Sequence, residues 1–182
     1  MHIFSIAGVS AAAREPEMRN RLFCTLNEAP DLEAFKLLYR LYHDGVWKTV
    51  FHPLERKAMQ KVVSESAGVF FRHPYKNING AVKTIFDTPE PPPVRLLERM
   101  LMLLEESDDG INEETRSLIA RCLDKFVPSH PDFFDFYGIG LEKRLERLCA
   151  GDQRSEVGIA LCETFIKVKA RIERQRELSE PE

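Results

Sequence analysis

The fold is decided by the stretch from Val94 to Ile172, which contains the segments VRLLERMLMLLE (94–105), SLIARCLDKF (117–126) and VGIALCETFIKV (157–168). In each segment apolar residues recur at intervals of three and four positions, the spacing that places side chains on one face of an α-helix. Three amphipathic helices in succession need to cover one another's apolar faces. The positions that carry this pattern are Val94, Leu97, Leu101 and Leu104; Leu118, Ile119, Cys122, Leu123 and Phe126; and Val157, Leu161, Thr164, Phe165 and Val168.

Breaks between these helices are signalled by residues that cap or end helices. Asn112 is a good N-cap, Pro128 and Pro131 prevent a helix from continuing, and Gly151 follows the end of another helix. We therefore expect an all-α fold of about eight helices, either a compact bundle or stacked helix hairpins, which is similar to armadillo or HEAT repeats in architecture alone. The helices expected in this half cover about 94–107, 113–127, 139–150 and 154–176.

The first half of the chain predicts shorter helices. Asp31 can cap a helix whose apolar stripe is Leu32, Phe35, Leu38, Tyr39 and Tyr42. The run VWKTVF (46–51) fits a strand or a helical turn by its length, and we assign it to a helix. The other helices expected here cover residues 16–28, 53–67 with Gly68 at the end, and about 80–86 after the turn signal Asn79-Gly80.

One segment is a candidate linker. In TPEPPP (88–93) the consecutive prolines fix an extended backbone and remove hydrogen-bond donors. The expected organisation is an N-terminal arm (1–15), a helical subdomain (16–88), a proline linker (89–93) and C-terminal helix hairpins (94–182). A single continuous domain over 16–176 is the alternative.

Charge and composition argue against a nucleic-acid or membrane partner. The chain has 182 residues and a formal net charge of −3, from 26 basic and 29 acidic residues. Binding to a polyanion needs a local basic patch, and no block of like charge supplies one. The densest basic segment alternates with Glu173 and Glu177, so we interpret it as a solvated helix face; it contains Lys167, Lys169, Arg171, Arg174 and Arg176.

The cysteines and the N-terminal residues indicate the cellular compartment of the protein. Cys24, Cys122, Cys149 and Cys162 occupy apolar phases of expected helices without metal-ligand spacing, which predicts buried, reduced thiols in a reducing compartment. A disulfide or a metal site is the alternative. No basic residue precedes Arg14, so residues 1–13 do not fit a secretory signal. We expect a cytoplasmic protein.

No motif in the chain identifies a reaction. GxSxG is absent, and Gly138-Ile139-Gly140 lacks the third glycine of a phosphate cradle, so it predicts a kinked helix entrance. The sequence therefore predicts no catalytic residue, no cofactor and no metal site, and a non-enzymatic protein. The alternative is an enzyme whose acid-base or metal site assembles from loops, with His73, His130, Asp132 and Asp135 as its residues.

Aromatic residues provide the strongest candidate for function. Phe133, Phe134, Phe136 and Tyr137 fall within five residues and either fill the core or present a sticky surface. Trp47 likewise either fills the core or lies on a binding surface. Our functional hypothesis is a protein–protein interaction module, an adaptor, scaffold or effector, that binds a partner peptide or helix in an aromatic and aliphatic groove. The oligomeric state is left open.

Overall fold

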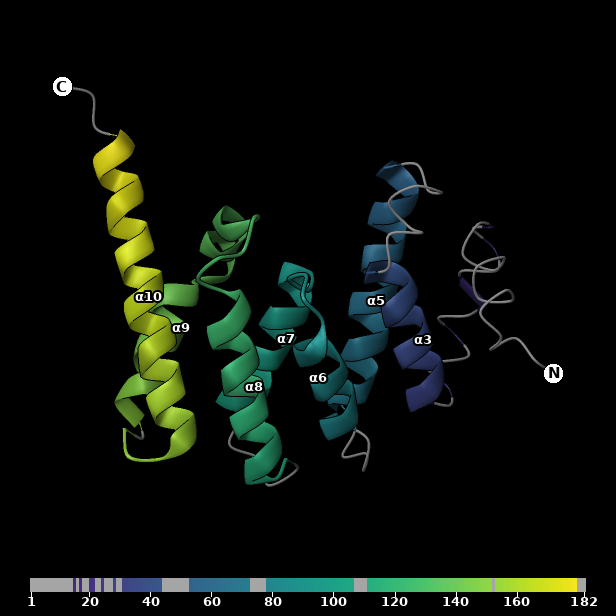
Figure 1. Ribbon diagram of the computed structural model, residues 1–182, viewed down its shortest axis with the longest axis horizontal. Coiled ribbons are helices and arrows are strands. Elements are labelled where there is room, and N and C mark those ends of the chain that lie inside the picture. Colours follow the sequence, from purple (N-terminus) through teal and green to yellow (C-terminus); the bar gives the residue numbers. More distant parts are fainter. Residues whose placement is uncertain are drawn as a thin grey trace. The chain divides into compact units, whose positions relative to one another are not determined.

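The computed structural model describes residues 15, 17, 20, 21, 24 and 28 and the segments 31–43, 53–72, 78–106, 111–151 and 153–179. Within these residues every regular element is a helix and none is a strand, which confirms the all-α prediction (Figure 1). There are eight helices in this part of the chain, of which η1 is a 3₁₀-helix. They are α3 (Leu32–His43), α5 (Pro53–Arg72), α6 (Ile78–Asp87), α7 (Val94–Glu105), α8 (Glu113–Phe126), η1 (Phe133–Ile139), α9 (Leu141–Gly151) and α10 (Glu156–Ser179).

The residues form two compact units, 1–96 and 97–182, and the boundary lies inside α7. In the first unit α3, α5 and α6 pack against one another. In the second unit α10 packs along both α8 and α9, and α9 contacts η1. Residues 88–93 lie outside the helices, as their prolines require. The division into subdomains at the proline linker stays a prediction.

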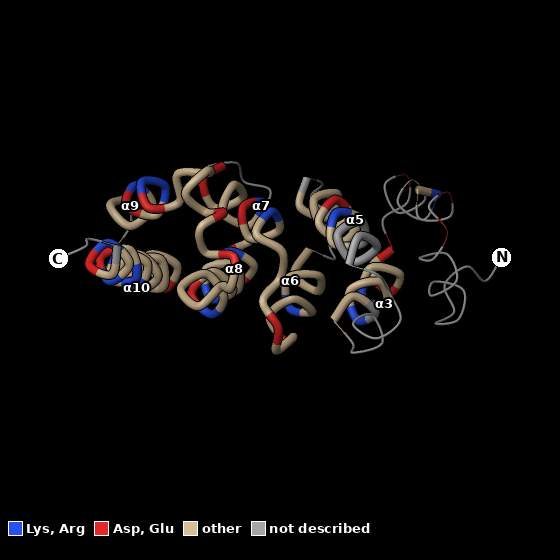
Figure 2. Tube along the Cα trace, turned by 90° about the horizontal axis from the view of Figure 1, so that it is seen from above, with Lys and Arg blue, Asp and Glu red and all other residues tan. Residues whose placement is uncertain are grey.

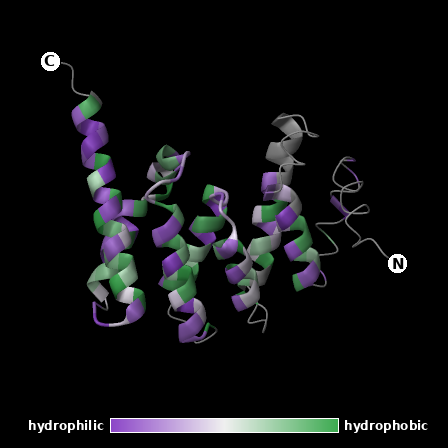
Figure 3. Cartoon of the chain, viewed as in Figure 1, coloured by the Kyte–Doolittle hydropathy of each residue, from purple (hydrophilic) through white to green (hydrophobic). Residues whose placement is uncertain are grey.

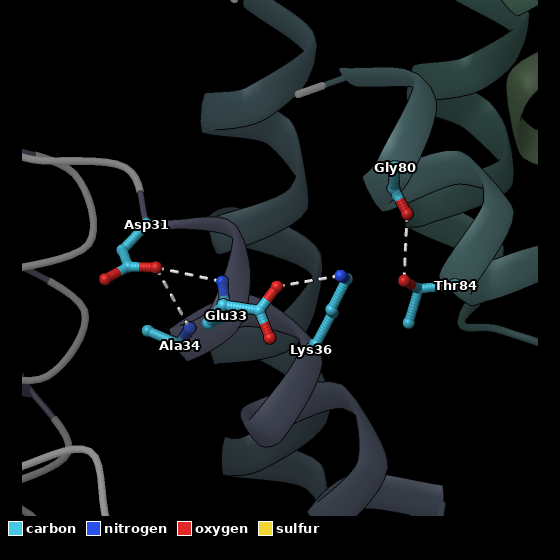
Figure 4. A network of polar contacts seen from close by, with 6 residues as sticks. All are labelled: Asp31, Glu33, Ala34, Lys36, Gly80 and Thr84. Atoms are coloured by element: carbon cyan, nitrogen blue, oxygen red, sulfur yellow. Dashed lines mark hydrogen bonds and ion pairs between the residues drawn. The ribbon is translucent and has the colours of Figure 1, made fainter. Parts of the chain in front are cut away.

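Helix α3 begins where the sequence predicts it. The Asp31 carboxylate accepts hydrogen bonds from the backbone N–H groups of Glu33 at 2.9 Å and Ala34 at 3.4 Å, which satisfies donors that have no partner inside the helix (Figure 4). Lys36 donates to Glu33 at 2.8 Å on the exposed side. The buried side of α3 consists of Ala34, Phe35, Leu38 and Tyr39.

We expect the substitution Asp31→Ala to lower the free energy of unfolding of the first unit by about 1 kcal/mol, because it removes the N-cap of α3. Urea unfolding monitored by circular dichroism measures this loss. Glu33→Ala is the matched control, since it removes a neighbouring carboxylate that makes only the exposed ion pair with Lys36. An equal loss in both variants would mean that charge, and not capping, is what Asp31 contributes.

Gly80 lies inside α6, in its first turn, where the sequence predicted a turn or the start of the helix. A Cβ atom at this position would lie 2.9 Å from Cδ2 of Leu32, the first residue of α3. The carbonyl of Gly80 accepts a hydrogen bond from the Thr84 hydroxyl at 2.8 Å (Figure 4). The glycine therefore permits the close approach of α3 to α6 and does not end a helix here.

The predicted end of α5 was wrong. The sequence placed it at Ala67 with Gly68 as the stop, whereas the helix continues to Arg72 with Gly68 buried inside it. Val69 and Phe71 beyond the glycine are buried. Burial of these two side chains outweighs the roughly 1 kcal/mol that glycine costs within a helix.

Several predictions fall on residues that the structure does not describe. These are the N-terminal arm except for Glu15, the run 46–51 with Trp47, the stop at 44–45, and His73. Of the helix predicted over 16–28, the described residues Glu17, Asn20, Arg21, Cys24 and Glu28 are helical.

Helices of the second unit agree with the sequence to within one to three residues at each end. Asn112 caps α8, as predicted, by accepting the N–H of Thr115 at 2.8 Å. The buried residues of α10 are Val157, Leu161, Thr164, Val168 and Ile172, while its turns near the C-terminus are mainly hydrophilic (Figure 3). Two starts are misplaced by two residues: α10 was expected at 154 and begins at Glu156, and α9 was expected at Ile139 and begins at Leu141. The later start of α9 follows from Gly140, which adopts a left-handed φ of 64° between η1 and α9.

Candidate functional site

The aromatic cluster forms the 3₁₀-helix η1, and its helical period divides the cluster into two pairs. A 3₁₀-helix repeats every three residues, so side chains three positions apart share a face. Phe133 and Phe136 share the inner face and are 1% and 2% exposed. Phe134 and Tyr137 share the outer face and are 63% and 48% exposed. One half of the cluster therefore fills the core and the other half presents a surface.

The two pairs form one continuous aromatic contact from core to surface. The Phe133 and Phe136 ring centroids lie 6.1 Å apart, and Phe133 meets Tyr137 edge to face, also at 6.1 Å. Tyr137 in turn stacks on Phe134 with an interplanar angle of 23°. Offset and edge-to-face arrangements are the favourable geometries for aromatic pairs. The buried pair thus fixes the position of the exposed pair.

A cavity of about 270 Å³ opens beside η1, and we refer to it as the η1 cavity. Its walls come from three elements: η1, the first turn of α9, and α10. The apolar lining is supplemented by the charged residues Glu142 and Lys143. The residues that line the cavity are Phe133, Phe136, Tyr137, Gly140, Leu141, Glu142, Lys143, Val168 and Ile172.

Arg171 of α10 holds the chain segment that leads into η1. Its Nη1 donates to the carbonyl oxygens of Pro128 at 2.7 Å and of His130 at 3.0 Å. The guanidinium carbon lies 4.1 Å from the Phe133 ring centroid, in cation–π geometry. Partial burial lowers the pKa of Arg171, the positive charge of Arg174 lowers it further, and Tyr137 acts in the opposite direction. Arginine stays charged at neutral pH in any such environment.

His130 is one of the residues of the alternative enzyme hypothesis. It is buried in the turn before η1. Its Nδ1 accepts the backbone N–H of Asp132 at 3.0 Å, and its ring meets Phe136 edge to face at 5.4 Å. Asp132 and Asp135 are exposed, and His73 is outside the described part of the chain. Among the described residues no three His, Cys, Asp or Glu side chains are grouped so that they could hold a metal ion.

The prediction of four buried, reduced cysteines was wrong at three positions. Cys149 and Cys162 form a disulfide with their Cα atoms 5.0 Å apart, and Cys24 is exposed. Only Cys122 is a buried thiol as predicted. The disulfide forms because α9 and α10 run antiparallel around a short turn, which brings together two residues that are 13 positions apart.

Two of the C-terminal basic residues, Lys167 and Arg171, make contacts with other parts of the second unit. Lys167 lies 2.7 Å from both carboxylate oxygens of Asp124 on α8, and Arg171 is engaged as described above. Acidic and basic residues are interspersed along α9 and α10 (Figure 2). The prediction of a wholly solvated face therefore needs correction at these two positions, because the packing of α10 on α8 brings hydrogen-bond acceptors within reach.

Sequence reasoning missed the cavity residues outside η1. Val168 and Ile172 lie four positions apart on α10. This spacing indicates that they share a helix face, but it does not indicate that the face lines a cavity. Leu141 was expected within a helix, and Arg171 was counted among solvated charges. Trp47, the remaining candidate, lies outside the described residues.

No helix among the described residues is long and apolar enough to cross a membrane. Comparisons with protein-family models, with curated proteins and with solved structures gave no match.

Proposed function

We propose that the protein is a non-enzymatic interaction module, and that it binds a helix or extended peptide of another protein in the η1 cavity. The observation that carries this proposal is the position of the exposed aromatic pair, Phe134 and Tyr137, next to an apolar cavity of which Tyr137 forms a wall. Interfaces concentrate their binding energy in aromatic residues beside pockets that exclude water.

The size of the cavity favours a side chain over a free small molecule. Sites for drug-sized ligands enclose roughly 300–1,000 Å³ and bury most of the ligand. At about 270 Å³ the η1 cavity lies at the lower edge of that range, a size that suits the anchoring side chain of a partner better than a whole drug-sized ligand. One large apolar side chain of a partner would fill it, while the backbone on either side of that anchor would lie against Phe134 and Tyr137.

The rigidity of the site also supports recognition. Tyr137 packs against the buried ring of Phe133, Phe134 stacks on Tyr137, and Arg171 fixes the preceding turn through two backbone carbonyl groups. A surface that is already ordered loses less conformational entropy on binding. The mixed charge of α9 and α10 supports a protein partner over a nucleic acid or an anionic membrane.

We place this module in the cytoplasm. Cys24 is an exposed, reduced thiol and Cys122 is a buried one, which is the state that a reducing compartment maintains. The Cys149–Cys162 bond would then be one that such a compartment can open.

A photo-crosslinking amino acid placed at position 137 of the full chain, in living cells, identifies the partner and the segment that contacts the cavity. Ile159 provides the control position, because it is 50% exposed and comparable in this respect to Tyr137. It precedes Val168 by nine residues, or about 13 Å along α10, and does not line the cavity. We expect one partner segment to crosslink from position 137 and not from position 159.

We expect Tyr137→Ser to weaken binding of that partner peptide by about 30-fold or more, the loss typical of an interface hot spot. Isothermal titration calorimetry measures the affinity, and far-ultraviolet circular dichroism is expected to be unchanged. Ile159→Ser, which removes an equally exposed apolar side chain, is expected to bind as the unmodified chain does. Equal weakening in both variants, or none in Tyr137→Ser, would contradict the proposal.

A further inference from the structure

The Cys149–Cys162 disulfide joins the last turns of α9 to the second turn of α10. Both cysteines are partly exposed, so a reductant in solution can approach the bond. Exchange requires a thiolate to reach one of the two sulfur atoms. Cys24 and Cys122 are not disulfide-bonded, so Cys149 and Cys162 form the disulfide of this chain.

Helix α9 packs along α10 and contacts η1, and its most deeply buried residues are unevenly placed. It has 11 residues, of which Leu141 and Leu145 are buried, and both lie in its first half. Arg144 also lies there and forms a bidentate ion pair with Glu105 of α7, with Nε 2.8 Å from Oε1. A helix of this length is marginal without such contacts. In the second half of α9 the residues are exposed or half-buried, and the disulfide is its covalent attachment to α10.

The same two helices form most of the η1 cavity. Leu141, Glu142 and Lys143 of α9 line it together with Val168 and Ile172 of α10. The disulfide sets the separation of these helices about two turns further along α9. Opening the bond would allow α9 to move relative to α10, and this movement changes the width of the cavity.

We propose that the Cys149–Cys162 disulfide is a reversible redox clamp, and that a dithiol reductant opens it and thereby weakens binding in the η1 cavity. The binding part of this inference rests on the proposed function, whereas the clamp itself does not. A clamp of this kind makes the η1 cavity responsive to the redox state of its surroundings.

The reaction is a two-electron thiol–disulfide exchange. A thiolate of the dithiol attacks one sulfur of the pair, forms a mixed disulfide with that cysteine, and releases the other cysteine as a thiolate that takes up a proton. The second thiol of the reductant then attacks the mixed disulfide and releases the first cysteine. The products are two cysteine thiols and the oxidised, disulfide form of the reductant.

Hydrogen–deuterium exchange of the full chain, with and without dithiothreitol, tests the clamp directly. On reduction we expect the backbone amides of α9 to exchange about tenfold faster or more, while those of α8 stay unchanged. Oxidised dithiothreitol is expected to restore the slow exchange. The double substitution Cys149→Ser with Cys162→Ser is expected to exchange fast in both conditions, whereas Cys24→Ser responds as the unmodified chain does.

The outcomes separate the clamp from the binding function. Unchanged α9 exchange on reduction, four thiols that persist after treatment with an oxidant, or unfolding of α8 together with bond opening would each overturn the clamp. The probe for binding is a peptide selected from a phage-displayed library on the oxidised chain, and we expect reduction to lower its affinity about tenfold. A clamp that opens while no selected peptide depends on Tyr137 would overturn the proposed function alone.

Discussion

Replacement of Phe133 by alanine is expected to lower the free energy of unfolding of the second unit by about 3–5 kcal/mol, the range for truncation of a buried phenylalanine. Phe133 is 1% exposed and touches Phe136, Tyr137 and Arg171. Its removal enlarges the η1 cavity and leaves the Arg171 guanidinium without its aromatic partner. Urea unfolding at constant temperature measures the change as a shift of the midpoint.

The neighbouring residue provides a matched control, because Phe134 is the same residue type and is 63% exposed. We expect Phe134→Ala to change the free energy of unfolding by less than about 0.5 kcal/mol, as exposed substitutions usually do. Should Phe133→Ala fail to fold, Phe133→Leu keeps most of the buried area and is expected to show a smaller loss in the same direction. Equal effects at positions 133 and 134 would mean that η1 does not have the orientation described.

Most of the fold can be predicted from the sequence, because local signals and burial agree there. In α8 the cap at Asn112, the acidic first turn and the apolar spacing of Ile119, Leu123 and Phe126 all indicate the same helix. Where local and tertiary effects compete, prediction fails. At Gly68 the local preference favours an end to the helix, but the burial of Val69 and Phe71 extends it.

The candidate site is less accessible to sequence reasoning, because it depends on which elements meet in space. The density of aromatic residues identified the segment that forms η1. Which rings point inward depends on a period of three residues in place of 3.6, and short 3₁₀-helices leave little trace in a sequence. The pairing of Cys149 with Cys162 likewise depends on the antiparallel packing of α9 and α10, which spacing alone does not specify.

Arg171 is another residue whose role depends on which elements meet in space. Its substitution is expected to have the second large effect on the free energy of unfolding. Arg171 stands among four other basic residues of a polar helix end, yet it joins α10 to the turn before η1 through Pro128 and His130. We expect Arg171→Met to lower the free energy of unfolding by about 2–3 kcal/mol, because it removes two hydrogen bonds from a charged donor and a cation–π contact. Methionine keeps an apolar stem of similar length, so the loss reports the guanidinium.

Arg174→Met is the matched control, since the Arg174 guanidinium is exposed and donates only to the carbonyl of Ala170 in its own helix, at 3.1 Å. We expect it to change the free energy of unfolding by less than about 0.5 kcal/mol. Arg171→Lys keeps the charge but not the planar fork, and is expected to fall between the two. Hydrogen exchange locates the effect: in Arg171→Met the amides of residues 130–137 are expected to exchange faster than those of α8. Faster exchange spread evenly over the second unit would show that Arg171 acts through general packing and does not position the aromatic pair.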